Sequence, residues 1–203
     1  MDEAVTIRVI HDPEKIKLLG DLVRRQLLRL ISDAPMTQKQ LSERMNLTEP
    51  SVSHHLTRLT DAGLVRINHT EVGSYGILQK YYEPTAKLFI EDWDSTPAEL
   101  RRYFIHAHME RLRGMLSVFQ MMVGENGNLL FDAAELESLA EVTAQRISKI
   151  AETYTVGETE DRENLLVQIY ATTLRNELMS GGLDRVEKSG RLKEIVNRVG
   201  IIG

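Results

Sequence analysis

The stretch Met36–Val65, MTQKQLSERMNLTEPSVSHHLTRLTDAGLV, decides the fold of this chain. Its first part has the spacing of a capping box, because Thr37 and Gln40 can each accept a hydrogen bond from the other's backbone N–H group. The helix that starts there ends near Asn46, a residue type that tolerates the left-handed conformation at a helix C-terminus. Thr48 then caps a second helix, which has a proline in its first turn and a glycine just past its end. The stretch therefore predicts two helices joined by a short turn.

The second of these helices, Glu49–Ala62, has two different faces. At 100° per residue, Leu56 and Leu59 fall within about 40° of Val52, and this apolar face is expected to pack on the rest of the domain. His55 flanks the apolar face and is expected to pack as well. The outward residues are small or hydrogen-bonding, with one cation, and they are Pro50, Ser51, Ser53, His54, Thr57 and Arg58. Short polar side chains suit a helix that enters the roughly 12 Å wide major groove of DNA, whereas a merely solvated face is usually rich in Glu and Lys.

The residues on both sides of this stretch predict the rest of a winged helix-turn-helix. Upstream, Val5–Val9 alternates apolar and polar residues as a half-exposed strand does, and Asp12-Pro13 begins a short helix. The helix that follows carries an apolar face made of Leu22, Val23, Leu27, Leu30 and Ile31. Downstream, Leu64–Thr70 and Ile77–Tyr82 predict the two strands of a hairpin around a glycine-containing turn. Residues 1–90 are therefore expected to form a winged helix-turn-helix DNA-binding domain.

The remainder of the chain, residues 91–203, is predicted to be helical after a linker over Glu91–Pro97. Its first helix carries one long apolar stripe of Ile105, Met109, Leu112, Leu116, Phe119 and Val123. Asp132 caps a second helix, a third ends at Gly181-Gly182, and a weaker helical segment over Leu183–Val199 is interrupted by a glycine. The predicted fold class is mainly α with a small β-hairpin wing, a winged helix-turn-helix followed by an all-helical C-terminal region.

Charge is divided unevenly between these two parts. The chain of 203 residues has a formal net charge of −5, but residues 1–90 hold 12 Lys/Arg and 11 Asp/Glu, whereas residues 91–203 hold 13 and 19. The acidic excess therefore lies in the C-terminal part. The near-neutral N-terminal part permits DNA binding without demanding it.

Composition disfavours several classes of protein. The chain has no Cys, so thiolate metal sites, thiol redox switches and cysteine nucleophiles are excluded, and the absence fits a reducing cytoplasm. No apolar run approaches the roughly 18–20 residues that span a bilayer, and the acidic start Met1-Asp2-Glu3 is unlike a signal peptide, so no membrane partner is expected. No Ser/His/Asp constellation, phosphate loop or suitably spaced carboxylate pair points to an enzyme or to a cofactor.

The stretch Met36–Val65 resembles the core of the ArsR-type winged helix-turn-helix repressors. The run Thr48–Leu56, TEPSVSHHL, followed by Leu59 and Ala62-Gly63-Leu64-Val65, carries most of the likeness. The segment Asp21–Ile31, DLVRRQLLRLI, is similar to the helix that precedes this core in the family. The resemblance covers about residues 12–85.

The resemblance implies a cytoplasmic homodimer that binds operator DNA through this helix and the hairpin wing. Four residues match the family's DNA-facing helix positions, namely Ser51, Ser53, His54 and Arg58. Gln38 matches the start of the supporting helix, which usually touches phosphate. The wing is then the hairpin around Gly73-Ser74, with Lys80 on its return strand. Ser74, Lys80 and the outward Thr57 complete the predicted DNA-binding set.

The chain also departs from the family pattern. Many ArsR-type proteins sense metals through Cys pairs, or through His and acidic residues on the helix after the wing, and this chain has no Cys. Its long acidic helical part exceeds the minimal family domain. The segment Lys80–Ala86, KYYEPTA, running into such a part, resembles an archaeal subgroup of ArsR-type regulators with an added helical domain. That likeness identifies no effector.

Histidines in the helical part are candidate metal ligands. His106 and Glu110 are four residues apart, so one helix face can present both to a zinc ion. Arg102 and Arg113 share that face, which favours an ordinary solvated surface, and no metal is expected. His108 flanks the apolar side and is predicted to be a core or interface histidine.

The long apolar stripe exceeds what one short domain covers, so dimer contacts are predicted at Ile105, Met109, Leu112, Leu116 and Phe119. Its methionines also suit a small-molecule pocket, but their helical spacing favours a core or an interface. The functional hypothesis is a homodimeric regulator, a repressor, that places two helices on a pseudo-palindromic operator in double-stranded DNA. Two alternatives stay open: a winged helix that docks on a protein, and a regulator whose helical part binds an unknown small molecule.

Overall fold

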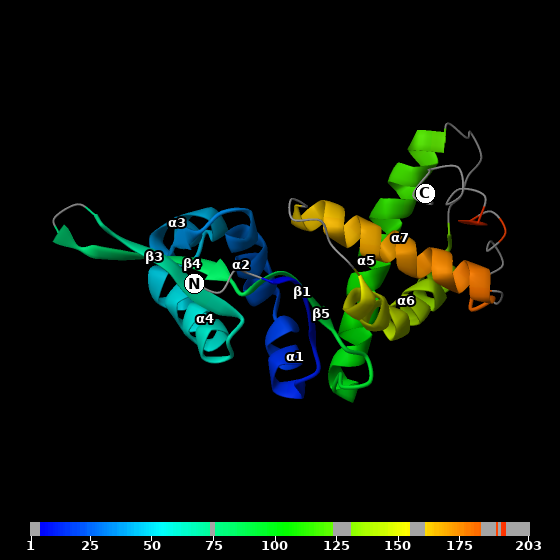
Figure 1. The fold of residues 1–203 in the computed structure, drawn as a ribbon, viewed down its shortest axis with the longest axis horizontal. Helices are drawn as coiled ribbons and strands as arrows, with labels where there is room; N and C mark the ends of the chain where they lie inside the picture. The colour runs from blue at the N-terminus through cyan, green and yellow to red at the C-terminus, as the bar shows by residue number, and fades with distance from the viewer. Residues whose placement is uncertain are drawn as a thin grey trace. The chain divides into compact units, whose positions relative to one another are not determined.

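The computed structural model describes residues 5–73, 76–123, 131–154, 161–183, 190 and 192–193. The chain divides into two compact units, Met1–Glu91 and Asp92–Gly203. The described residues form seven helices, and every strand among them belongs to the first unit (Figure 1). The predicted fold class is confirmed, with a helix-turn-helix, an antiparallel hairpin after it, and a helical C-terminal region.

The helix-turn-helix forms where its local signals place it. The helices of the first unit are α1 (Pro13–Leu19), α2 (Leu22–Asp33), α3 (Gln38–Met45) and α4 (Glu49–Asp61). The capping box of α3 is complete, because the Gln40 amide nitrogen donates to Thr37 Oγ1 at 3.2 Å and the Thr37 amide nitrogen donates to Gln40 Oε1 at 2.8 Å. Asn46 ends α3 in the left-handed conformation, with φ of 52°. These caps set the turn between α3 and α4.

Helix α4 is held on the domain by its apolar face. Val52, Leu56 and Leu59 are 0%, 1% and 0% exposed, as the helical spacing predicts. The helix contacts α2, α3 and the strand that follows it. Burying three aliphatic side chains contributes several kcal/mol, at about 1.5–3 kcal/mol each. The face that remains outside is therefore determined by the packing of the inner one.

The hairpin wing consists of β3 (Val65–Val72) and β4 (Leu78–Pro84), which pair antiparallel. Both strands are longer than the sequence predicts, and the hairpin projects beyond the helices (Figure 1). A two-residue strand that was not predicted, β2 (Met36–Thr37), pairs with the other edge of β4 and gives the sheet order β2-β4-β3. The wing tip at Ser74, one of the predicted DNA-binding residues, lies outside the described residues.

A second, parallel sheet joins the two ends of the first unit. Strand β1 (Val5–Ile10) pairs with β5 (Ala86–Glu91), with Ile7 beside Leu88 and Ile10 beside Glu91. The strand β1 was predicted, whereas β5 was not. The prediction that Glu91 belongs to a linker is wrong, because this residue ends β5 and is 8% exposed.

The rest of the predicted linker is an ordered turn in the second unit. Asp92 is buried, and its carboxylate accepts hydrogen bonds from the Ser95 amide at 3.0 Å, the Ser95 hydroxyl at 2.7 Å and the Ser148 hydroxyl at 3.2 Å. The Thr96 hydroxyl donates to the Asp92 carbonyl at 2.6 Å. Asp and Ser are abundant in loops because they make such local bonds, so the composition of this segment alone predicts a linker.

The second unit is built from α5 (Ala98–Val123), α6 (Ala133–Thr153) and α7 (Arg162–Ser180). Helix α6 begins with a capping box between Asp132 and Glu135 and packs against both α5 and α7. The core includes Phe104, Leu112, Leu139, Ile147, Leu165 and Ile169. Most of the predicted helical segment Leu183–Val199 lies outside the described residues. Within the described ranges, no helix combines the length and the apolar character needed to cross a membrane.

Candidate nucleic-acid interface

The outer face of α4 presents the side chains that the sequence predicts for DNA contact. The structure leaves His54, Thr57 and Arg58 exposed and Ser51 and Ser53 half-buried. No acidic residue lies between Glu49, the first residue of the helix, and Asp61, the last. The central turns therefore present hydroxyls, an imidazole and a guanidinium, all of which can bond phosphates or base edges. DNA contact by each of these residues stays a prediction.

Gln38 stands where α3 and α4 approach each other. Its side-chain amide donates to the Glu49 carbonyl at 3.0 Å, which ties the start of α3 to the first turn of α4. An amide group has two N–H donors, so one remains for a phosphate oxygen. The structure thus gives Gln38 a role in positioning α4, and its predicted phosphate contact stays untested.

The inner flank of α4 meets a cluster of charged groups on α2. Arg24 is 8% exposed, donates from Nε to the Leu18 carbonyl at 2.7 Å, and pairs with Asp21 at 3.5 Å. Burial lowers the pKa of Arg24, and the nearby Arg58 guanidinium also lowers it, while Asp21 raises it. These contacts lock the end of α1 against α2 beside the flank of α4.

His55 belongs to this flank and not to the outer face. Burial lowers its pKa, and its Nδ1 is enclosed without a hydrogen-bond partner among the described residues. Its ring meets that of His54 edge-on, with 5.7 Å between centroids. The neighbouring histidines thus separate as the helical spacing predicts, with His55 packed and His54 exposed.

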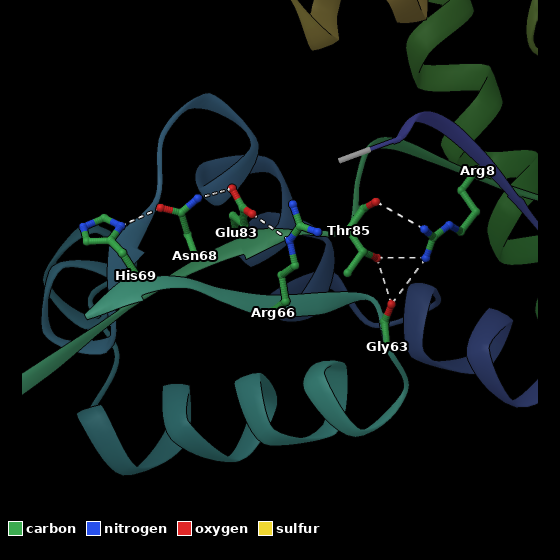
Figure 2. A network of polar contacts seen from close by, with 7 residues as sticks. All are labelled: Arg8, Gly63, Arg66, Asn68, His69, Glu83 and Thr85. Carbon is green, nitrogen blue, oxygen red and sulfur yellow. Dashed lines mark hydrogen bonds and ion pairs between the residues drawn. The ribbon is translucent and has the colours of Figure 1, made fainter. Parts of the chain in front are cut away.

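The wing carries a polar base and an apolar end. Near the base, Arg66 pairs with Glu83 at 2.7 Å and Asn68 donates to the same carboxylate at 2.7 Å (Figure 2). The His69 ring stacks on that of Tyr81, with 4.3 Å between ring centroids. The Glu71 carboxylate, which accepts from the Tyr81 hydroxyl, raises the pKa of Tyr81. Lys80 is exposed on β4 opposite Thr70.

Apolar side chains flank the wing tip, which sequence reasoning missed. Val72, Ile77 and Leu78 are 74%, 65% and 57% exposed, and Val72 pairs across the strands with Leu78. Arg66 and Lys80 are the Lys/Arg residues of β3 and β4, and Arg66 is held by Glu83. The described part of the wing therefore offers a phosphate backbone little positive charge. The apolar residues on both sides of Gly73–Gly76 in the sequence are the signal from which this apolar surface could have been predicted.

The residues predicted as dimer contacts lie mainly inside one chain. Met109, Leu112 and Leu116 are 7%, 0% and 4% exposed, because the single chain already covers this side of α5. Ile105 is partly exposed, and the side chain of Phe119 lies outside the described residues. The long stripe that motivated a dimer is thus largely accounted for by the core of the second unit. A contact between copies stays a prediction.

The histidines of α5 have separate surroundings. His108 is 2% exposed and its Nδ1 bonds the hydroxyl of the fully buried Tyr170, so it is a core histidine. Glu110 pairs with Arg113 at 2.8 Å, and His106 is exposed. Across the described ranges, no three His, Asp or Glu side chains gather in a way that would hold a metal ion.

Comparison with known proteins agrees with the geometry of the helix-turn-helix. Residues 21–66, which contain α2, α3 and α4, match the family model described as bacterial regulatory protein, arsR family. The chain carries an ArsR-family domain. The transcriptional repressor SdpR of Bacillus subtilis (strain 168) is 37% identical over 49 residues, which are 24% of this chain and 54% of that protein. The match thus spans about half the length of this relative, and β1, β5 and the second unit lie outside the family match.

Proposed function

We propose that this chain is a DNA-binding transcription regulator that recognises double-stranded DNA through α4. The observation that carries this proposal is the pairing of a fully buried inner face with an outer face that has no acid over its central turns. The helix lies within the ArsR-family match, and the name of the similar protein, a transcriptional repressor, supports repression as the direction of regulation.

The roles of the side chains follow from their chemistry. Arg58 has a planar fork of donors that suits a guanine edge or a phosphate, and the short hydroxyls of Ser51, Ser53 and Thr57 permit close approach to base edges. His54 can donate or accept a hydrogen bond. Gln38, Lys80 and Ser74 are proposed as phosphate contacts that fix the register.

Few cations support this interface, so its salt dependence should be modest. Residues 1–90 have a net charge of only +1, and Arg66 on the wing is neutralised by Glu83. The slope of log K against log salt measures the number of neutralised phosphates, at roughly 0.9 per phosphate. We expect a slope well below that of a protein with about ten phosphate contacts.

A homodimer on a pseudo-palindromic operator completes the proposal. Two copies would place their α4 helices in successive major grooves, about 34 Å apart. We place the contact between copies on α5, at the partly exposed Ile105 and the exposed Val118 and Met121, because Met109, Leu112 and Leu116 are covered within one chain. The second unit, which is acidic, would then hold the copies together without competing for DNA.

Capture of genomic DNA fragments by the purified full-length protein tests the proposal. Wild-type protein should enrich fragments that share a dyad-symmetric motif with half-sites about 10 base pairs apart. The Arg58→Ala variant should lose this enrichment, while Arg113→Ala, which removes one exposed arginine from α5, should keep it. Equal enrichment by Arg58→Ala, or none by the wild type, would contradict the proposal, and binding of a protein in place of DNA would support a protein-docking role.

A further inference from the structure

The C-terminal end of α4 is closed by a tight backbone motif at Gly63. The Leu64 amide donates to the Leu59 carbonyl at 2.9 Å and the Gly63 amide donates to the Thr60 carbonyl at 2.9 Å. These are the two bonds of a Schellman motif, whose left-handed residue favours glycine. Gly63 has φ of +69°. Its own carbonyl is left to bond groups outside the helix.

The acceptor at Gly63 is used by Thr85, the residue that joins β4 to β5. The Thr85 hydroxyl donates to the Gly63 carbonyl at 2.8 Å, and the Thr85 amide donates to the Leu64 carbonyl at 3.0 Å. Two bonds therefore tie the end of α4 to the junction of the two sheets.

Arg8 on β1 completes this network (Figure 2). Its Nη1 donates to the Thr85 hydroxyl at 3.0 Å and to the Gly63 carbonyl at 3.5 Å, and its Nη2 donates to the Thr85 carbonyl at 3.3 Å. An arginine only donates hydrogen bonds, whereas a hydroxyl donates one and accepts others. The hydrogen bonds therefore run from Arg8 to the Thr85 hydroxyl and from that hydroxyl to the Gly63 carbonyl. A charged donor polarises the hydroxyl and strengthens its bond to the next acceptor.

Arg8 and Thr85 both lie outside the family match at residues 21–66. Arg8 reaches the network because β1 pairs with β5, where Arg8 lies beside Phe89. The segment that follows β5 begins the second unit at Asp92. The structure thus adds to the matched domain a polar clamp that holds the end of α4 from β1 and from the junction of β4 and β5, both outside that match.

We propose that Arg8 and Thr85 are positioning residues for DNA recognition, an inference that rests on the proposed function. They fix the C-terminal end of α4 and so the placement of Arg58, which lies five residues before Gly63, or about 7.5 Å along the helix axis. The side chains of a binding site must be held to within about 0.5 Å of their productive positions. A small displacement of the C-terminal end of α4 would therefore weaken the DNA contacts of Arg58, although neither Arg8 nor Thr85 contacts DNA in this proposal.

The test measures affinity for a captured DNA fragment with full-length variants at several salt concentrations. Thr85→Val, which removes the hydroxyl at nearly constant volume, should weaken binding by up to about fivefold, because the roughly 1 kcal/mol that one hydrogen bond contributes limits how far the helix end can shift to a conformation that does not bind. Thr85→Ser should restore wild-type affinity. Arg8→Ala should weaken binding to a similar degree, Arg8→Lys less, and the double variant Arg8→Ala/Thr85→Val little more than either alone. The salt slope should be the same in every variant, since no phosphate contact is lost.

Controls separate positioning from loss of fold. Arg101→Ala removes one arginine that stacks on Trp93 in the second unit, and it should leave affinity unchanged. Amide exchange of Leu64 in the free protein should quicken in Thr85→Val and recover in Thr85→Ser, while the amides of α3 keep their protection. Equal affinities for wild type, Thr85→Val and Arg8→Ala would overturn the inference and leave the proposed function standing. Wild-type protein that binds no DNA fragment would overturn both.

Discussion

Helices α4 and α5 each bury leucines on one face, and they differ in the residues that they expose. In α4, Leu56 and Leu59 are 1% and 0% exposed, and in α5, Leu112 and Leu116 are 0% and 4% exposed. The outside of α4 has no acid over its central turns, whereas the outside of α5 includes an ion pair between Glu110 and Arg113 at 2.8 Å. The buried stripes therefore show only that each helix packs against its own unit. The exposed residues are what distinguish a candidate DNA-binding helix from a solvated one.

The largest expected effects are losses of stability caused by substitutions in the buried apolar stripes of α4 and α5. Leu56→Ala should lower the free energy of unfolding of the first unit by about 2–5 kcal/mol, because it leaves a cavity at a fully packed site. Leu112→Ala should cost the second unit a similar amount. Urea unfolding followed by a probe in each unit measures both. A loss below about 1 kcal/mol for either variant would mean that its stripe is not a core.

The outer faces should respond differently to loss of an arginine. Arg58→Ala should weaken operator binding by about 1–3 kcal/mol, whereas Arg113→Ala on α5 should leave it unchanged. Both variants remove one exposed cation, so the difference between them isolates position from charge. Titration of a captured fragment at fixed salt measures the effect. Equal affinities would remove Arg58 from the interface.

The capping boxes of α3 and α6 allow a matched pair of substitutions whose expected effects on stability are smaller and similar in size. Thr37→Ala removes the box of α3 and Asp132→Ala removes that of α6, and each should cost about 1 kcal/mol of stability. Only Thr37→Ala should also weaken DNA binding, because α3 positions α4 through Gln38. Thermal unfolding and binding titration of the two variants separate these effects. If Asp132→Ala weakened binding as much, the division of roles between the units would be wrong.

The smallest expected effect is a dependence of stability on pH from His55. Burial lowers the pKa of His55 in the folded state, beside Asp21, Arg24, His54 and Arg58. Below the unfolded value of about 6.5, the unfolded chain binds a proton that the folded chain does not, so this contribution to stability falls as pH drops. The contribution of His55 to stability is complete above the unfolded pKa and is lost once the pH has fallen to the lowered pKa of the folded state. His55→Gln should lose less stability than wild type between pH 7 and 5, and identical profiles would contradict this account.

Local chemistry made much of the first unit predictable. The Thr37–Gln40 capping box, the left-handed Asn46 and the apolar spacing of Val52, Leu56 and Leu59 are each decided within a few residues. The separation of His54 from His55 follows from the same helical spacing. These features determine which residues face out, so the candidate interface on α4 could be predicted almost entirely from sequence.

Features that depend on distant partners could not be predicted. Strand β5 pairs with β1 about 80 positions away in sequence, with Val5 beside Ala86, and no local pattern specifies that partner. The Asp92 carboxylate is also bonded by a hydroxyl on α6, and the cover of the α5 stripe is supplied by helices further along the chain. The clamp of Arg8 and Thr85 has the same origin. Each arises from tertiary packing between segments that are separate in sequence.

Chemical probing of guanine N7 in a captured operator tests the central claim most directly, since N7 lies in the major groove. If the outer face of α4 enters that groove, wild-type protein should protect guanines at two symmetric positions about one helical turn apart. Arg58→Ala should lose protection there, while Arg113→Ala should keep it. Guanine N7 atoms left unprotected in the bound operator, or a pattern unchanged by Arg58→Ala, would contradict the account.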